Sequence, residues 1–217
     1  MKDNNAIGIE FFKQGKYEEA IKAFTEEIEK NPKNAVAYVN FGNVLNTVGE
    51  TVRAIKFYEK AIEIDENAAA AYYSLGNTYF EQDNIHKAKE NFELAMKKGL
   101  HDSDTFFMLG MTMLKFEQPK LALPYFQRAV ELNADDAEAR FQFGLCLAGQ
   151  NMLDETIEQM EHVLTLDENH ADAHYNLGVA YAYKENKEKA LHHLGKAVEI
   201  QPDHILAAHA KKVISEN

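Results

Sequence analysis

Glycine recurs at a constant spacing of 34 residues along the chain, at Gly8, Gly42, Gly76, Gly110, Gly144 and Gly178. A fixed period of this length is typical of a repeat protein, in which each unit packs only on its neighbours. We therefore expect six tandem units instead of a single core: 1–34, 35–68, 69–102, 103–136, 137–170 and 171–204. The remaining segment, 205–217, is too short for a further unit and is predicted to be a C-terminal capping helix.

The charge of the chain restricts the class of partner. It has 23 Lys and Arg against 35 Asp and Glu, a net charge of −12. Nucleic-acid binding depends mainly on phosphate contacts from Lys and Arg, so a nucleic-acid partner is disfavoured. The acidic excess is concentrated in 103–170, which holds 4 basic and 12 acidic residues. This excess either serves solubility alone or attracts a basic partner.

The sequence also indicates where the protein works. No segment stays apolar for the roughly 18 residues that a membrane span needs, and the N-terminal sequence has no apolar run of the signal-peptide kind. The single cysteine, Cys146, cannot form an internal disulfide and agrees with a reducing compartment. We expect a cytoplasmic protein with no membrane partner.

Each unit contains two amphipathic stretches joined by a short polar turn. In the first stretch, bulky residues at positions 4, 7 and 11 of the unit share one helix face, as Tyr38, Phe41 and Leu45 do. In the second, small residues at positions 20 and 27 alternate with a bulky one at 24, as Ala54 and Tyr58 show. Glycine inside a helix costs about 1 kcal/mol relative to alanine, so its repetition at position 8 indicates a close helix crossing. Each unit is predicted to be a helical hairpin.

This pattern resembles the tetratricopeptide repeat (TPR) over essentially the whole chain. The resemblance implies an all-α fold, a right-handed α-solenoid of six 34-residue helix-turn-helix repeats plus the capping helix. In the fifth unit Arg140 replaces the bulky residue at position 4, and the small and bulky positions of its second helix hold Thr156, Met160 and Val163. We expect this unit to be the most loosely packed. Pro124 lies about one turn into a predicted helix, where a local irregularity is expected.

The resemblance further implies that the first helices of the hairpins line a concave groove, faced by positions 2, 5, 6, 9, 12 and 13. From the third unit to the sixth, large apolar side chains occupy many of these positions: Tyr73, Phe107, Met108, Met111, Phe141, Leu145 and Tyr175. Core packing is already assigned to positions 4, 7 and 11. The second apolar stripe therefore favours ligand binding, with packing or end-to-end self-contact as the alternative.

Asparagines give the second and third units a more polar groove surface. Asn40, Asn43 and Asn77 carry amides that can both donate to and accept from a peptide backbone. They are similar to the asparagines with which several TPR domains hold a peptide main chain. The alternative is that these side chains only solvate a helix face.

Carboxylates stand at position 2, on the expected lip of the groove: Asp104, Glu138 and Asp172. The cations with which chaperone-tail-binding TPR domains hold a C-terminal dicarboxylate are missing from the matching positions of this chain. Acidic lips repel a carboxylate and attract Lys or Arg. We therefore predict a protein or peptide partner that is apolar with basic flanks.

Chemistry receives little support from the sequence. His170 and His174 are four residues apart, a spacing that can share a metal, but they straddle a repeat boundary and no HExxH or Cys-His set accompanies them. Surface and inter-repeat histidines are the alternative. Cys146 suits a core thiol better than a nucleophile, since no base is evident beside it. We expect no enzymatic activity, no metal and no cofactor.

The chain ends bear on assembly. The capping helix is expected to turn one face to the sixth unit, formed by Ile205, Leu206, His209, Val213 and Ile214. A monomer is favoured, and end-to-end self-association stays open because the first helix has no dedicated cap.

The leading hypothesis is a peptide-binding adaptor. Its alternatives are a structural subunit that docks folded partners or itself through its convex face or ends, and an enzyme or metal carrier that uses the C-terminal histidines.

Overall fold

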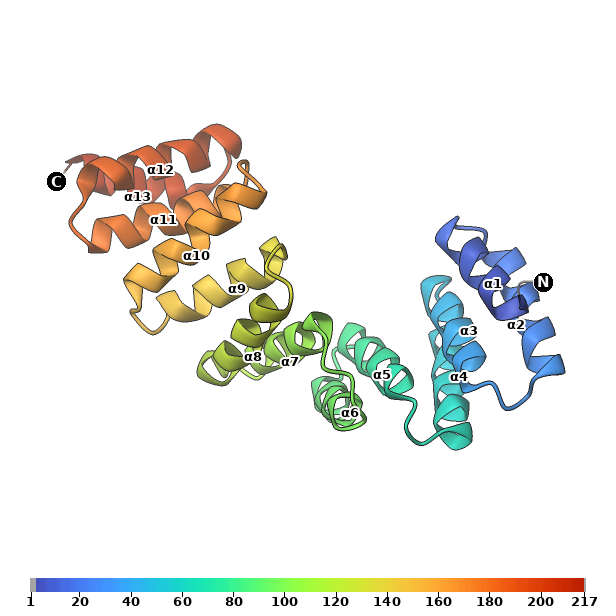
Figure 1. The fold of residues 1–217 in the computed structure, drawn as a ribbon. Helices are drawn as coiled ribbons and strands as arrows, with labels where there is room; N and C mark the ends of the chain where they lie inside the picture. Colours follow the sequence, from blue (N-terminus) through green and yellow to red (C-terminus); the bar gives the residue numbers. More distant parts are fainter. Residues whose placement is uncertain (1–2, 217) are drawn as a thin grey trace. The chain divides into compact units, whose positions relative to one another are not determined.

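The computed structural model describes residues 3–216, and every regular element in this range is an α-helix. The helices follow one another in the order shown in Figure 1. They are α1 (Asn4–Lys13), α2 (Tyr17–Lys30), α3 (Ala35–Thr47), α4 (Thr51–Ile64), α5 (Ala69–Glu81), α6 (Ile85–Lys97), α7 (Ser103–Lys115), α8 (Pro119–Leu132), α9 (Ala137–Ala148), α10 (Leu153–Leu166), α11 (Ala171–Tyr183), α12 (Lys187–Ile200) and α13 (Ile205–Glu216).

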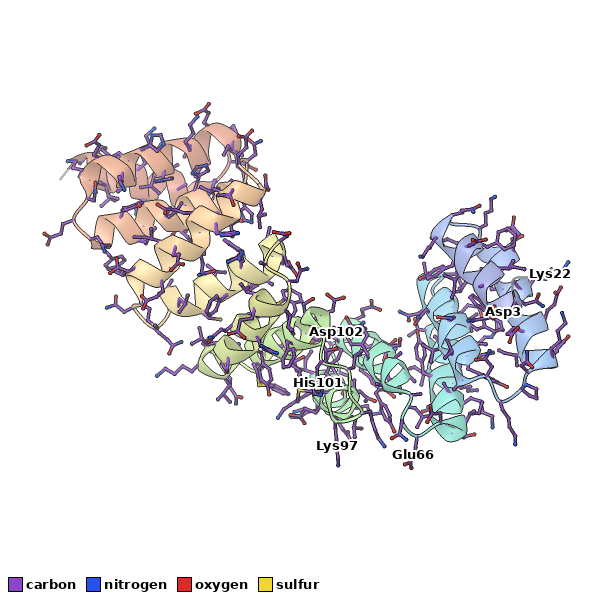
Figure 2. The ribbon with its side chains drawn as sticks, viewed as in Figure 1. Asp3, Lys22, Glu66, Lys97, His101 and Asp102 are labelled. Carbon is purple, nitrogen blue, oxygen red and sulfur yellow. The ribbon has the colours of Figure 1, made fainter. Side chains whose placement is uncertain are left out.

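The chain divides into two compact units, Met1–His101 and Asp102–Asn217. The division falls between two residues labelled in Figure 2. Within each unit every helix packs on the next one in the chain, and α1, α3 and α5 also touch in succession, as α9, α11 and α13 do. This packing of consecutive helix pairs confirms the predicted all-α solenoid class. No helix in the described range combines the length and the apolar character that a membrane crossing requires.

A contact between the glycine at position 8 and the bulky residue at position 24 closes each hairpin. A Cβ atom built on Gly42 would lie 2.4 Å from Cε1 of Tyr58, and one on Gly76 would lie 2.6 Å from Cδ1 of Phe92. Both aromatic side chains are fully buried. The two helices therefore approach so closely that a Cβ atom at position 8 would overlap these rings, which agrees with the close crossing that the sequence predicts.

The turn inside each hairpin uses a left-handed residue at position 15. The backbone angle φ is positive at Gly15, Gly49, Asp83, Glu117, Asn151 and Glu185. In the first two repeats this residue is glycine, which adopts such a conformation without steric cost. In the other four repeats it carries a Cβ atom. This position is not evident from the sequence, because its residue type varies from repeat to repeat.

The first helix of most hairpins begins with a side-chain cap at position 34 of the preceding repeat. Asn34, Asp102 and Asp136 each accept a hydrogen bond from the backbone N–H three residues later, at 3.3, 2.9 and 3.0 Å. His170 and His204 do the same through Nδ1, at 3.1 and 3.2 Å. These caps satisfy backbone donors that a helix start leaves free.

Pro124 does not interrupt its helix, so the predicted irregularity is wrong. Helix α8 runs unbroken over 14 residues, the same length as α2, α4, α10 and α12, and Pro119 occupies its first turn. Proline removes one hydrogen bond, the one to the carbonyl of Lys120. Both Pro124 and Lys120 are exposed, so water can satisfy that carbonyl.

The capping helix buries a face that shares only Ile214 with the predicted one. Ala207 is fully buried, and Ala210 and Ile214 pack with it against α12. The larger apolar residues that were expected to face inward are exposed, at 81% for Ile205, 60% for Leu206 and 43% for Val213. Small side chains allow α13 to approach α12 closely, and this determines which face is buried.

Alanine at position 8 should be costly where the neighbour is a rigid ring and tolerated where it is flexible. The Cβ of Gly76→Ala would overlap the Phe92 ring, and we expect a loss of about 1–2 kcal/mol after the helix-propensity gain of alanine. In Gly144→Ala the overlap is with the end of Met160, at 2.7 Å from Cε, which can move. This variant should stay within about 1 kcal/mol of the wild type. Urea unfolding followed by circular dichroism compares the two, and equal losses would contradict the explanation.

Glycine at a non-glycine left-handed position should stabilise the chain. Glu117 has a φ of 58° and is exposed, so its side chain contributes little packing to offset the backbone strain. We expect Glu117→Gly to raise the free energy of unfolding by about 0.5–1 kcal/mol. The control is Gln118→Gly, at the next position, which should destabilise. A fall in the unfolding midpoint of Glu117→Gly would show that the strain is not stored there.

Candidate functional site

The predicted groove residues are distributed over the two compact units, Met1–His101 and Asp102–Asn217, which are called the first and second unit from here on. They lie on the first helices of the hairpins, from α3 to α11. The first unit holds Asn40 and Asn43 on α3 and Tyr73 and Asn77 on α5. The second unit holds the remaining candidates: Asp104, Phe107, Met108 and Met111 on α7, Glu138, Phe141 and Leu145 on α9, and Asp172 and Tyr175 on α11. Each unit therefore presents its own surface, polar in the first and largely apolar in the second.

Asn43 is oriented by two hydroxyl groups. Its Oδ1 accepts a hydrogen bond from the hydroxyl of Tyr58 at 3.0 Å and from that of Ser74 at 2.9 Å. Burial raises the pKa of Tyr58 above its usual value, so the phenol keeps its proton and remains a donor. With Oδ1 occupied, the amide N–H₂ of Asn43 is left to donate elsewhere. This orientation suits recognition of a carbonyl oxygen.

The other groove asparagines differ in how far they are already engaged. Asn40 donates to Oδ1 of Asn5 at 3.0 Å, and Asn46 donates to Glu81 at 3.1 Å. Oδ1 of Asn46 is buried and has no partner among the described residues. The side chain of Asn77, half-buried on α5, makes no hydrogen bond with any described residue. The first unit thus combines amides that hold neighbouring helices together with amides that remain available.

The aromatic residues at position 5 are half-buried and contribute to packing as well as to the surface. In the earlier repeats they contact the bulky residue at position 24, with ring centroids 5.7 Å apart for Tyr73 and Phe92 and 5.8 Å for Phe107 and Phe126. Packing is therefore not confined to positions 4, 7 and 11, as the sequence pattern had indicated, and extends to position 5. Each ring nevertheless keeps part of its surface exposed.

In the last two repeats the position 5 rings also pack against the core, and their aromatic neighbours are histidines. Phe141 lies 4.6 Å from His170, and Tyr175 lies 5.0 Å from His204, between ring centroids. Because Nδ1 of His204 accepts the helix-capping bond, its proton is on Nε2, which donates to Asp172 at 3.1 Å. The structure therefore gives these histidines capping and stacking roles. The signal in the sequence was their shared position 34, where the first, third and fourth repeats have Asn or Asp and the second has Ala68.

The lip carboxylates keep their predicted exposure. Asp104 and Glu138 are exposed and accept hydrogen bonds only from uncharged neighbours, Ser103 and Gln142. Asp172 is exposed and faces His204. Two of the three carboxylates therefore have no cation beside them in the second unit, as a basic ligand requires.

A hollow of about 210 Å³ opens on α11 between its groove positions and the adjoining hairpin. Its wall is formed by Ala148, Asn151, Leu153, Thr156, Asn176, Val179, Ala180 and Tyr183. Three of these, Asn176, Val179 and Tyr183, occupy positions 6, 9 and 13, which the resemblance places on the groove surface. Tyr183 is 72% exposed. These three residues do not stand out in the sequence, because the hollow depends on the small Ala148 and Ala180 beside them.

The candidate metal-binding histidines and the cysteine take up structural positions. His170 and His174 do not form a pair; Nδ1 of His174 lies 3.0 Å from Nδ1 of His193 instead. Within residues 3–216, no group of three or more His, Cys, Asp or Glu side chains is arranged to hold a metal ion. Cys146 is buried, and burial raises the pKa of its thiol to about 11, so it stays protonated at neutral pH.

Family comparisons agree with the repeat architecture. A family model described as "TPR repeat" matches residues 8–49 and 42–83, and models described as "Tetratricopeptide repeat" match residues 107–160 and 171–204. Together these matches cover more than half of the chain. The chain belongs to the tetratricopeptide repeat family. Members of this family are interaction modules that bind proteins or peptides.

A bacterial TPR protein shares both sequence and structure with this chain. The TPR repeat-containing protein YrrB of Bacillus subtilis (strain 168) is 56% identical over 37 residues, which are 17% of this chain and 18% of YrrB. Its crystal structure aligns with a TM-score of 0.81 and 56% identity, covering 88% of this chain and 99% of the YrrB chain. YrrB is described as a TPR protein with an unusual peptide-binding site.

More distant structures share the fold alone. PilF of Pseudomonas aeruginosa aligns with a TM-score of 0.84 at 18% identity, covering 99% of this chain and 96% of PilF. MamA aligns with a TM-score of 0.69 at 24% identity, covering 80% of this chain and 95% of MamA. These similarities show that the TPR packing is retained at low identity.

The histidine pair should make this TPR array sensitive to mild acid. Burial, then the neighbouring His174 and His192, lowers the pKa of His193 to about 4, although Glu161 opposes the shift, and burial also lowers that of His174. Because the unfolded imidazole titrates at 6.5, the unfolded chain binds more protons between pH 6.5 and 4. The free energy of unfolding should therefore fall as pH falls through this range. Thermal melts at pH 7 and pH 5 measure the loss.

The control for this experiment removes the titrating pair. His174→Gln with His193→Gln should show a smaller change in melting temperature between pH 7 and pH 5 than the wild type, whatever its stability at pH 7. An equal change in both proteins would assign the acid sensitivity to other groups.

Proposed function

We propose that the chain is a non-catalytic adaptor that binds a peptide or exposed protein segment on the surface formed by the first helices of its hairpins. The segment is apolar with basic flanks. The observation that carries this proposal is the surface of the second unit, where half-buried Phe107, Met108 and Phe141 accompany the unpaired carboxylates of Asp104 and Glu138. Aromatic and Met side chains provide large, adaptable contact area.

The two units contribute different kinds of recognition in this proposal. In the second unit an apolar ligand side chain enters the hollow between Asn176 and Tyr183, and basic residues approach the lip carboxylates. In the first unit the amides of Asn43 and Asn77 donate to carbonyl oxygens of the ligand main chain. The peptide-binding site described for YrrB supports peptide recognition as the general mode. The adaptor works as a cytoplasmic monomer without cofactor or metal.

The test is a peptide-display selection that compares the wild type with a groove variant. Phe107 and Phe141 also pack internally, so the groove variant is Met108→Glu with Tyr183→Glu, which leaves those two rings in place. We expect the selected apolar and basic peptides to bind the groove variant at least about tenfold more weakly, since interface anchors contribute more than about 1 kcal/mol each.

The matched control is Val52→Glu, which places the same charge on an exposed apolar residue of α4, 70% exposed. This control should bind like the wild type, and circular dichroism verifies that all three proteins remain helical. Selected peptides that bind the groove variant as tightly as the wild type would refute the proposed surface.

A further inference from the structure

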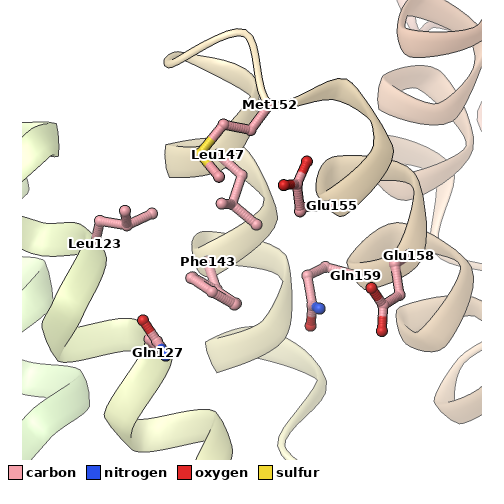
Figure 3. A pocket seen from close by; sticks show the side chains of 8 residues that line it. All are labelled: Leu123, Gln127, Phe143, Leu147, Met152, Glu155, Glu158 and Gln159. Carbon is pink, nitrogen blue, oxygen red and sulfur yellow. The ribbon is translucent and has the colours of Figure 1, made fainter.

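A second hollow lies between α8, α9 and α10, all within the second unit (Figure 3). Its volume is about 260 Å³, and it is lined by Leu123, Gln127, Phe143, Leu147, Met152, Glu155, Glu158 and Gln159. None of the groove residues proposed above lines it. The apolar side chains of Leu123, Phe143, Leu147 and Met152 come from three successive segments of the chain and surround the space.

The hollow exists because the fifth repeat lacks the aromatic side chains that occupy this place in the second repeat. There, Phe57 packs on Phe41 with ring centroids 4.4 Å apart, and Tyr38 lies 5.9 Å from Phe57. The matching residues of the fifth repeat are Gln159, Phe143 and Arg140, 102 residues further along the sequence.

The polar replacements leave the floor of the hollow open. Gln159 accepts a hydrogen bond from Nη1 of Arg140 at 3.0 Å, and this bond fixes its side chain. Phe143 is half-buried, whereas Phe41 is only 5% exposed. The ring of Phe41 is therefore covered within the second repeat, whereas the equivalent ring of Phe143 is left partly uncovered in the fifth.

Two carboxylates on the rim have no internal partner. On α10, Asp154 forms an ion pair with Lys184, and Glu161 accepts a hydrogen bond from Tyr181. Glu155 and Glu158, three residues apart on one face, have neither an ion pair nor a hydrogen bond with any described residue. Like charges at this spacing repel each other, and a cation between them relieves the repulsion. The corresponding positions in the second repeat hold Arg53 and Lys56, so the acidic rim is particular to the fifth repeat.

We infer that this hollow is a second docking site, which accepts a Leu, Met or Phe side chain of a partner protein next to a Lys or Arg that pairs with Glu155 and Glu158. Its volume is below the roughly 300–1,000 Å³ of small-molecule sites and suits one or two protein side chains. An acidic ligand is disfavoured by the rim. Arg140, which is bonded to the lining residue Gln159, is buried and also donates to the carbonyl of Ala134.

The decisive variant fills the hollow with the residues of the second repeat. Arg140→Tyr together with Gln159→Phe reproduces the arrangement of Tyr38 and Phe57 and removes the buried guanidinium at the same time. A second variant, Glu155→Gln with Glu158→Gln, changes only exposed side chains and keeps the test open if the filled variant does not fold. The Met108→Glu, Tyr183→Glu groove variant separates this site from the proposed groove.

The probe is a display library of random twelve-residue peptides, selected against the groove variant so that only sites outside the groove enrich peptides. We expect enrichment of sequences with Leu, Met or Phe next to Lys or Arg. Binding of these peptides should be at least about tenfold weaker to the filled variant. It should be about two- to fivefold weaker to the Gln variant, the range for exposed charge pairs, and this difference should shrink at high salt.

Three results would overturn the inference. The first is equal binding to the wild-type and filled hollow. The second is enrichment of acidic peptides, or of none, against the groove variant. The third is a dimer in light scattering that the filled variant abolishes while peptide binding is absent, which would assign the hollow to a second copy of the chain. Loss of groove binding alone leaves this site unaffected, so failure of the two proposals is distinguishable.

Discussion

The rest of the structure depends on the contact between the glycine at position 8 and the bulky residue at position 24. Wherever a Cβ is added to these glycines, it meets the partner side chain at less than 3.0 Å, from Phe24 in the first hairpin to Leu194 in the last. This contact sets the separation of the two helices in every hairpin. Because the separation is constant, the same positions of each first helix stay on the surface. Equivalent side chains of successive repeats, 34 residues apart in the sequence, therefore recur along that surface.

Class and packing could be predicted because they follow from this periodic contact, whereas local conformations could not. A repeating Gly and its bulky partner are visible in the sequence, and the structure confirms the helical hairpins. The left-handed residue at position 15 was missed because Gly49 and Glu117 adopt the same backbone in spite of their different chemistry. The face of α13 was predicted wrongly apart from Ile214, because the small Ala207 packs against Leu194 and Ala197 of α12 while Leu206 stays exposed. Here the distance of approach outweighed hydrophobicity.

The residues proposed for recognition could be placed on the first helices from the sequence, but the contacts that each side chain makes could not be predicted. Position 5 carries the large rings, yet whether such a ring meets another aromatic ring or a histidine depends on positions 24 and 34 of its repeat, which hold Met160 and His170 beside Phe141. The orientation of an amide is likewise set by neighbours, as the two hydroxyl groups on Asn43 show. A single sequence gives the positions of such groups and leaves open which of their atoms remain free to bind. That information arises only when adjacent repeats are packed together.

The fifth repeat shows how an array of equal units gains a distinctive surface. Substituting polar residues for the aromatic pair of the second repeat removes apolar contacts, which lowers packing quality, and the same change uncovers Phe143 beside two carboxylates. Stability and recognition are therefore coupled at this place, since a side chain that fills the hollow improves packing and removes the surface at once. In a chain whose units otherwise satisfy one another, an imperfectly packed repeat is where a partner can supply the missing contacts.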